Sequence, residues 1–360
     1  MVQFARLEYL PTFIFRWSEI IGIENLSEEE KQLLFPLFRI RPWANSKSLA
    51  NSFDRINQAM SGNPFACDVD DWYDKERSNT GAAQELRNIL QDPSYSQWYE
   101  FVRQFDNAIP CLRLDTEIEN IEDALRQEWL EARGFGIVLN EYNLRYLRNA
   151  LACLPNIHHN NFFVAVDMGW SRDPLQQAQQ ATSICVDLLR AKPDVTIFLS
   201  SSSFPVSFDN FGFGEAVNCA EYALYDEVRR QLQAVNNEYF VKYADWGTTR
   251  PPSDGGGGWI PRIDLPRGRN IRLYRRRIAD DETKDEVCSA IAAEVTASDE
   301  WVTPPPSWGH YQIETTAAGG QQGIYHARKN SATRINMYLH QKLSELGALP
   351  EVTGEEPFEG

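Results

Sequence analysis

The run NFFVAVD at residues 161–167 is followed by a helical pattern over residues 174–189 and then by the run VTIFLS at residues 195–200. Both runs are rich in β-branched and aromatic residues and lack polar alternation, which is typical of strands covered on both faces. The stretch between them is long enough for the helical crossover that joins two parallel strands. This part of the chain therefore predicts a strand–helix–strand unit of an α/β fold.

Six more runs of the same kind occur along the chain. They lie at residues 12–17 (TFIFRW), 34–40 (LFPLFRI), 64–70 (PFACDVD), 109–115 (IPCLRLD), 134–140 (GFGIVLN) and 239–245 (YFVKYAD). Helical patterns between the runs cover residues 48–60, 81–90, 121–132, 141–154 and 215–235. Eight strands that alternate with helices over roughly 250 residues are typical of a (β/α)₈ barrel. We therefore predict a TIM-barrel-like domain over residues 1–250, with an open doubly wound sheet as the alternative.

The alternation of strands and helices stops near residue 250 of the 360-residue chain. A glycine-rich stretch at residues 251–258 predicts a flexible loop, and residues 270–278 predict a further strand. Helical patterns follow at residues 291–298 and 331–346, with a stiff proline linker at 304–306. We predict a C-terminal α+β elaboration over residues 251–349 that packs on the barrel, and an acidic flexible tail over residues 350–360.

The chain is strongly acidic. It has 35 Lys and Arg residues against 51 Asp and Glu residues, a formal net charge of −16. A surface of this charge repels phosphate backbones and anionic lipid, which argues against general nucleic-acid or membrane binding but leaves local basic sites open. No apolar run approaches the roughly 18 residues of a membrane span, and the N-terminus lacks the pattern of a signal peptide. We therefore expect a cytoplasmic protein.

The cysteines fit the same compartment. The six cysteines are at least 32 residues apart, so none form a CxxC pair. The five histidines have no zinc-binding spacing either. Since free cysteine packs as a small apolar side chain, we expect buried, unpaired thiols and no zinc site.

Charged side chains follow several of the predicted strands, where the chemistry of a barrel enzyme is found. The candidate catalytic residues are Asp68, Asp70, Asp115, Asp167 and Asp245. Arg39 and Arg113 are candidates for binding an anionic substrate. Three interpretations are open: Mg²⁺ or Mn²⁺ held by Asp68, Asp70 and Asp167, acid–base or glycosidase chemistry by paired carboxylates, or structural Asp–Arg pairs.

Residues i and i+2 of a strand share a face. Asp68 therefore pairs with Asp70, and Tyr243 with Asp245. If the even-numbered residues of the third strand face inward, both of its carboxylates line the barrel mouth.

Aromatic and hydroxyl side chains crowd the same strand ends. Five tryptophans lie within a few residues of them, namely Trp17, Trp43, Trp72, Trp170 and Trp246. Such rings stack on a sugar or a base, or cap the barrel core against water. We take Trp170 and Trp246, with Ser203, as candidates for binding substrate. Arg275, in the run RRR at residues 275–277, either clamps a phosphate or pairs with acids such as Asp280 and Asp281.

Short motifs along the chain resemble those of the beta protein family, which is found in bacteria and prophages. The matching segments are residues 36–42 (PLFRIRP), 167–169 (DMG), 203–205 (SFP) and 245–247 (DWG). The resemblance implies a barrel-like fold and a role in the conflict between phage and bacterium. Two positions depart from the family pattern: Arg39 stands where an acidic residue is usual, and residues 330–336 (NSATRIN) lack the histidines of that segment.

Three functions from different classes are compatible with this sequence. The first is a metal-assisted hydrolase of a phosphorylated or nucleotide-like substrate, with the strand-end acids at its centre. The alternative is a non-catalytic recognition module that binds a phage component or an operon partner protein. A structural phage or assembly protein is the third. The expected partners are thus a small anionic substrate or a protein.

Overall fold

The computed structural model describes residues 2–73, 79–251, 259–301 and 307–346. Eight parallel strands form a closed barrel, because the last barrel strand pairs with the first. The strands, in order, are β1 (Tyr9–Ile14), β2 (Leu37–Ile40), β3 (Phe65–Val69), β4 (Ala108–Leu112), β5 (Phe135–Leu139), β6 (Phe162–Trp170), β7 (Thr196–Ser202) and β9 (Lys242–Asp245). The predicted (β/α)₈ barrel is therefore confirmed, and the open sheet is excluded.

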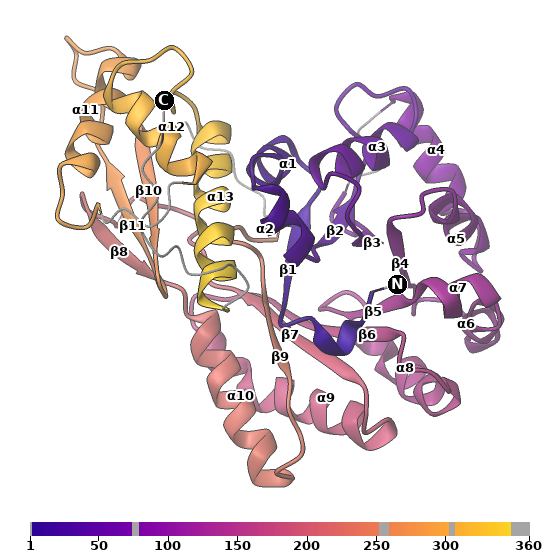
Figure 1. Cartoon of the computed structure of the whole chain (residues 1–360). Coiled ribbons are helices and arrows are strands. Elements are labelled where there is room, and N and C mark those ends of the chain that lie inside the picture. Colours follow the sequence, from indigo (N-terminus) through magenta and orange to yellow (C-terminus); the bar gives the residue numbers. More distant parts are fainter. Residues whose placement is uncertain (1, 74–78, 252–258, 302–306, 347–360) are drawn as a thin grey trace, which may run out of the picture.

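Helices cover the outside of the barrel (Figure 1). They are α1 (Trp17–Glu24), α2 (Glu28–Leu33), α3 (Ala50–Ala59), α4 (Gly81–Ile89), α5 (Ser96–Arg103), α6 (Ile118–Leu125), α7 (Glu128–Arg133), α8 (Leu147–Cys153), α9 (Ala178–Ala191) and α10 (Glu221–Val235). Four 3₁₀ turns accompany them at Phe4–Arg6, Leu144–Tyr146, Leu154–Asn156 and Pro174–Gln177. The helix predicted over 121–132 is divided into α6 and α7, and α5 was not predicted.

The register of the strands places apolar side chains inside the barrel and polar ones above them. One buried cluster takes Leu37 from β2, Ala66 from β3 and Val138 from β5, together with residues from other strands, whereas the alternate residues pack with the helices. Because strand side chains alternate, the residues two positions further on face the interior as well. The upper interior is therefore lined by Arg39, Asp68, Arg113, Asn140, Asp167, Ser200 and Trp246.

A three-stranded antiparallel sheet and three helices lie beside the barrel (Figure 1); all are C-terminal to β9 except the strand β8, which lies between β7 and α10. These elements are β8 (Glu215–Asn218), β10 (Arg262–Arg267), β11 (Asn270–Arg275), α11 (Lys284–Thr296), α12 (Trp308–Ala317) and α13 (Ala327–Glu345). The helix predicted over 215–235 is wrong at its start, because Glu215–Asn218 pairs with β11 and α10 begins only at Glu221. The predicted loop over 251–258, linker at 304–306 and tail over 350–360 fall outside the described residues, apart from Pro251.

Helix α13 joins this extension to the barrel through buried polar side chains. Arg334 donates to the Asp264 carboxylate and to Thr248 Oγ1 at 3.2 Å, and Asn330 Nδ2 donates to Asp264 at 2.9 Å. Asn336 Nδ2 donates to the Gly22 carbonyl at 3.0 Å, in α1. Although burial opposes it, the neighbouring arginines hold the pKa of Asp264 below its ordinary value.

All six cysteines are buried and unpaired, as predicted. Burial raises the pKa of the Cys67 and Cys185 thiols, so these groups are poor nucleophiles. None of the helices in the described ranges is both long and apolar enough to cross a membrane.

We expect Arg334→Met to lower the free energy of unfolding by about 3 kcal/mol, because the buried Asp264 carboxylate loses one of its two guanidinium partners. Urea denaturation of the full chain measures this loss. Arg126→Met is the matched control, since the Arg126 side chain is 68% exposed and pairs only with acids beside it on α6. Equal stability of the two variants would contradict the structural role of Arg334.

Candidate functional site

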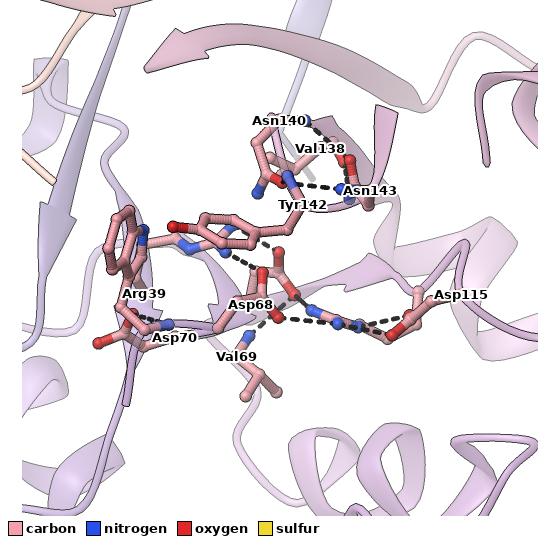
Figure 2. A network of polar contacts seen from close by, with 12 residues as sticks. Arg39, Asp68, Val69, Asp70, Asp115, Val138, Asn140, Tyr142 and Asn143 are labelled. Atoms are coloured by element: carbon pink, nitrogen blue, oxygen red, sulfur yellow. Dashed lines mark hydrogen bonds and ion pairs between the residues drawn. The ribbon is translucent and has the colours of Figure 1, made fainter. Parts of the chain in front are cut away.

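A network of paired charges fills the barrel mouth on the side of β2, β3 and β4. Arg39 donates to Asp68 at 2.7 Å and to Asp71 at 2.5 Å. Arg113 donates to Asp68 at 3.2 Å, to Asp71 at 2.9 Å and to Asp115 at 3.1 Å. Figure 2 shows Asp68 between Arg39 and the line of bonds that ends at Asp115. We call these five residues the charged layer.

The two arginines and three aspartates of the charged layer offset one another's charges. Burial disfavours its charges, but the aspartates raise the pKa of the Arg113 guanidinium and the two arginines lower the pKa of the Asp71 carboxyl. Both oxygens of Asp68 accept from an arginine, and Asp68 also accepts from the Val69 N–H at 2.8 Å. The predicted catalytic and substrate-binding residues of this side therefore bind one another, as in the structural interpretation of the sequence.

The three aspartates predicted to share a metal ion are not brought together. Asp70 turns away from the charged layer and accepts from Arg41 Nε at 2.8 Å. Asp167 lies on β6, across the barrel mouth from Asp68. In the part of the chain that the structure describes, no group of three or more His, Cys, Asp or Glu side chains is arranged to hold a metal ion.

The other side of the mouth contains a cavity of about 350 Å³, which we call the mouth cavity. It opens at the ends of β5 and β6, and its walls include apolar residues of both strands and of α9. Its volume is within the range of small-molecule sites. The polar and aromatic side chains that line it are Trp72, Asn140, Glu141, Asp167, Trp170, Gln177, Gln180 and Arg250.

Two carboxylates of the mouth cavity lie on either side of Gly169. Asp167 accepts from the Gly169 N–H at 3.0 Å and from Trp246 Nε1 at 3.2 Å. A Cβ at Gly169, whose φ is +69°, would lie 3.9 Å from Glu141 Oε1. Burial raises the pKa of the Asp167 carboxyl, the hydrogen bonds oppose that rise, and the charge of Glu141 adds to it. Asp167 is thus a buried carboxyl with a raised pKa beside a solvent-exposed one.

Two tryptophan rings stand at the edge of the mouth cavity. Trp72 and Trp170 are 40% and 39% exposed, although both are held in place. Trp170 Nε1 donates to the Phe204 carbonyl at 2.6 Å, and Trp72 meets Tyr142 edge to face with ring centroids 4.9 Å apart. Fixed and exposed indole faces suit the stacking of a sugar or base ring.

Four further predicted site residues do not line the mouth cavity. Asp245 shares a face with Tyr243 as predicted, but this face is the outer one: Asp245 accepts from Tyr9 Oη at 2.6 Å and from Tyr338 of α13. Ser203 donates to the buried Glu221, and Arg275 lies in β11, 3.6 Å from Asp209. Trp246 faces the interior, where it holds Asp167 rather than lining the cavity.

The sequence interpretation missed Glu141 and Arg250 as site residues. Glu141 lies two residues after the end of β5, and Asp167 lies near the end of β6, so the position of Glu141 after a strand was the available signal. The adjacency of the two carboxylates depends on the parallel pairing of β5 with β6. Arg250 comes from the segment after β9 and had no such signal.

Comparison with known proteins agrees with the motif resemblance. A sequence model described as "Beta protein" matches residues 9–344. The chain is also 26% identical over 357 residues to "Protein beta" of Enterobacteria phage P4, a match that covers 97% of this chain and 96% of that protein. These matches span the barrel and the extension together, and they confirm the family predicted from the motifs.

We expect Asp68→Ala to lower the free energy of unfolding by about 3–5 kcal/mol, because two buried guanidinium groups lose a shared carboxylate. Urea denaturation with and without Mg²⁺ measures the change, with Asp123→Ala, whose side chain is 70% exposed, as the control. If Asp68 has a structural role, Asp68→Ala loses the same unfolding free energy with and without Mg²⁺. A loss seen only with Mg²⁺ would instead make Asp68 a metal ligand.

The Glu221 carboxyl predicts a pH-dependent stability. Burial raises its pKa to about 7, the bond from Ser203 opposes the rise, and Asp245 adds to it. The folded chain therefore binds this proton more tightly than the unfolded chain, so the stability it contributes is present at low pH and is lost as the pH rises from about 4.5 to 7.

Between pH 4.5 and pH 7 the wild type should lose at most about 3 kcal/mol of unfolding free energy relative to Glu221→Gln. Thermal and urea unfolding of both proteins between pH 4.5 and pH 8 check this. Glu238→Gln, at an exposed position, is the control. Parallel pH profiles of the wild type and Glu221→Gln would contradict the assignment.

Proposed function

The chain belongs to the Beta protein family, and from that membership and the mouth cavity we propose that it is a hydrolase of a small nucleotide-like or phosphorylated molecule, acting in conflict between phage and bacterium. The single observation that carries the enzymatic part is the pair of carboxylates at Gly169, one buried with a raised pKa and one exposed. Such a pair is what general acid–base hydrolysis requires.

Each carboxylate has a distinct role in this proposal. Asp167, whose pKa is raised by burial, is the general acid, and it donates a proton to the oxygen of the leaving group as the scissile bond breaks. Glu141, which reaches solvent, accepts a proton from the attacking water, whose oxygen forms the new bond. Trp246 Nε1 and the Gly169 N–H fix the Asp167 carboxyl during the transfer.

The substrate class follows from the rest of the cavity. Trp72 and Trp170 offer exposed ring faces for a base or sugar, and Arg250 adds a cationic group to the wall. A volume of about 350 Å³ is enough for a molecule of nucleoside size but not for a polymer. The similarity to a protein of Enterobacteria phage P4 supports the proposal that this chain acts in conflict between phage and bacterium.

The metal-assisted form of this hydrolase stays a proposal with a changed set of ligands. Asp68 and Asp70 are bound by arginines, which leaves Asp167 and Glu141 as the carboxylates that face the cavity. Mg²⁺ is commonly bound by one or two carboxylates together with substrate phosphates, so this pair suffices once a phosphorylated substrate is present. Metal dependence of the activity separates this form from the acid–base form.

A recognition module is the second candidate, and one surface feature favours it. Apolar side chains around the cavity are exposed, namely Trp170, Leu175 and Val206. Exposed apolar residues with a polar rim are typical of protein-binding surfaces. In this case the cavity would hold a side chain of a phage or operon partner protein, and the carboxylates would recognise a basic group on it.

We expect Asp167→Asn and Glu141→Gln each to lower kcat at least 100-fold, because each removes one proton transfer while keeping size and hydrogen bonding. The measurement is hydrolysis of a panel of nucleotides, phosphodiesters and nucleosides by the full chain, followed by chromatography, in EDTA, Mg²⁺ and Mn²⁺. Asp123→Asn, on the outer face of α6, is the matched control.

The outcomes separate the two candidates. Turnover that is lost in both carboxylate variants and kept in Asp123→Asn supports the hydrolase. Turnover that survives in Asp167→Asn and Glu141→Gln would overturn the assigned roles. A silent panel, together with a partner protein that binds the wild type but not Trp170→Ala, would favour the recognition module instead.

A further inference from the structure

A second cavity, of about 690 Å³, lies at the rim where the extension meets the barrel. Its walls come from the turn after β1, from the segment between β2 and α3, and from the first turn of α13. Its lining includes three arginines and three half-buried aromatic residues, namely Arg16, Trp17, Arg41, Trp43, Tyr73 and Arg328. We call this cavity the basic groove. It is unusual because it collects cations in a chain with a net charge of −16.

The arginines of the basic groove are only partly neutralised. Arg16 is 4.0 Å from Glu19, too far for a direct hydrogen bond between the two side chains. Burial lowers the pKa of Arg16, and the charge of Arg41 lowers it further against the effect of Glu19. Arg328 is exposed, and within the described ranges it pairs with no carboxylate. Arg41 has a close partner in Asp70, whose carboxylate accepts from Arg41 Nε at 2.8 Å.

Further cations stand next to the groove on the extension. Besides burial, the charges of Lys284, Lys329 and Arg328 lower the pKa of His326, which precedes α13. The positive end of the α13 dipole lies at the same place, since Ala327 begins that helix. The local potential is therefore positive, and an anion would relieve the repulsion between these groups.

The aromatic rings of the groove are half-buried and braced. Trp43 packs on Phe15 with ring centroids 5.1 Å apart, and Trp17 packs on His326 at 6.0 Å. The Arg41 guanidinium lies 5.6 Å from the centre of the Tyr73 ring. Rings held in this way stack on a nucleobase at low entropic cost.

We propose that the basic groove binds a nucleoside phosphate, with the base against Trp17 and Trp43 and the phosphates against Arg16 and Arg328. Neither feature alone selects this class: arginines alone would take any small anion, and aromatic rings alone would take any flat molecule. The volume of about 690 Å³ accommodates both parts of such a ligand. Because Arg328 belongs to α13, the bound ligand would bridge the barrel and the extension.

The basic groove is separate from the mouth cavity but close to it. Tyr73 lines the groove and the preceding Trp72 lines the mouth cavity. Burial lowers the pKa of Arg250, which lines the mouth cavity, and the charge of Arg16 lowers it further. Binding in the groove does not require that the mouth cavity be catalytic, so this proposal stands or fails independently of the hydrolase.

The test is isothermal titration calorimetry of the full chain with ADP, adenosine and pyrophosphate in EDTA. We expect ADP to bind with a dissociation constant below 1 mM, at least tenfold tighter than either adenosine or pyrophosphate, and to weaken as KCl rises. Arg328→Glu and Arg16→Ala should each weaken ADP binding at least tenfold. Arg230→Glu, whose parent side chain is 69% exposed on α10, should leave it unchanged. Circular dichroism checks that each variant is folded. If Arg16→Ala does not fold, Arg328→Glu alone tests the proposal, because the Arg328 side chain is exposed and its replacement should not unfold the chain.

Four results would overturn the proposal: no ADP binding by the wild type up to 1 mM, equal affinity for ADP and adenosine, equal affinity for ADP and pyrophosphate, or full ADP affinity in Arg328→Glu. A double variant of the mouth cavity, Glu141→Gln with Asp167→Asn, shows which of the two cavities binds ADP. It should bind ADP as the wild type does if the groove is the site. Loss of ADP binding in that variant would assign the nucleotide to the mouth cavity instead.

Discussion

The buried Asp68 carboxylate between Arg39 and Arg113 is the constraint on which the barrel mouth depends. Side chains must fill the interior of an eight-stranded barrel, and here the upper filling is charged rather than apolar. Arg39, Asp68 and Arg113 are each less than 10% exposed, so each charge is tolerable only because the others neutralise it. The network links the ends of β2, β3 and β4 to one another, and the mouth cavity lies on the side of β5 and β6.

Helix α13 sets the second condition, because it covers the barrel from outside. Its residues reach barrel residues far away in the sequence: Arg334 binds at Thr248, Asn336 at Gly22 and Tyr338 at Asp245. These bonds fix the first turn of α13 at the rim beside β1. The basic groove exists only because of that placement, since one of its walls belongs to the extension.

Much of the fold could be predicted from the sequence, because each barrel strand is a continuous apolar run that shows its burial directly. The short strand Glu215–Asn218 could not be, since its partner lies more than 50 residues later. The sequence also could not predict which side chains at a strand end face the barrel interior. It pairs Tyr243 with Asp245 on one face, but it does not show that the interior face is that of Ala244. For the site, Asp167 was predicted, whereas Glu141 required knowing that β5 lies beside β6.

Two aspartates of the same mouth show why the neighbours of a residue, and not its type, determine its chemistry. Asp71 is largely buried, but Arg39 and Arg113 lower its pKa, so it remains ionised and holds the arginines in place. Asp167 is also buried, yet its partners are an indole and a backbone N–H, which stabilise its charge too weakly to offset burial. Burial also raises the pKa of Asp68, although the same two arginines oppose that rise. The pKa of each aspartate in this mouth therefore reflects the balance between its burial and the charges and hydrogen bonds of its partners.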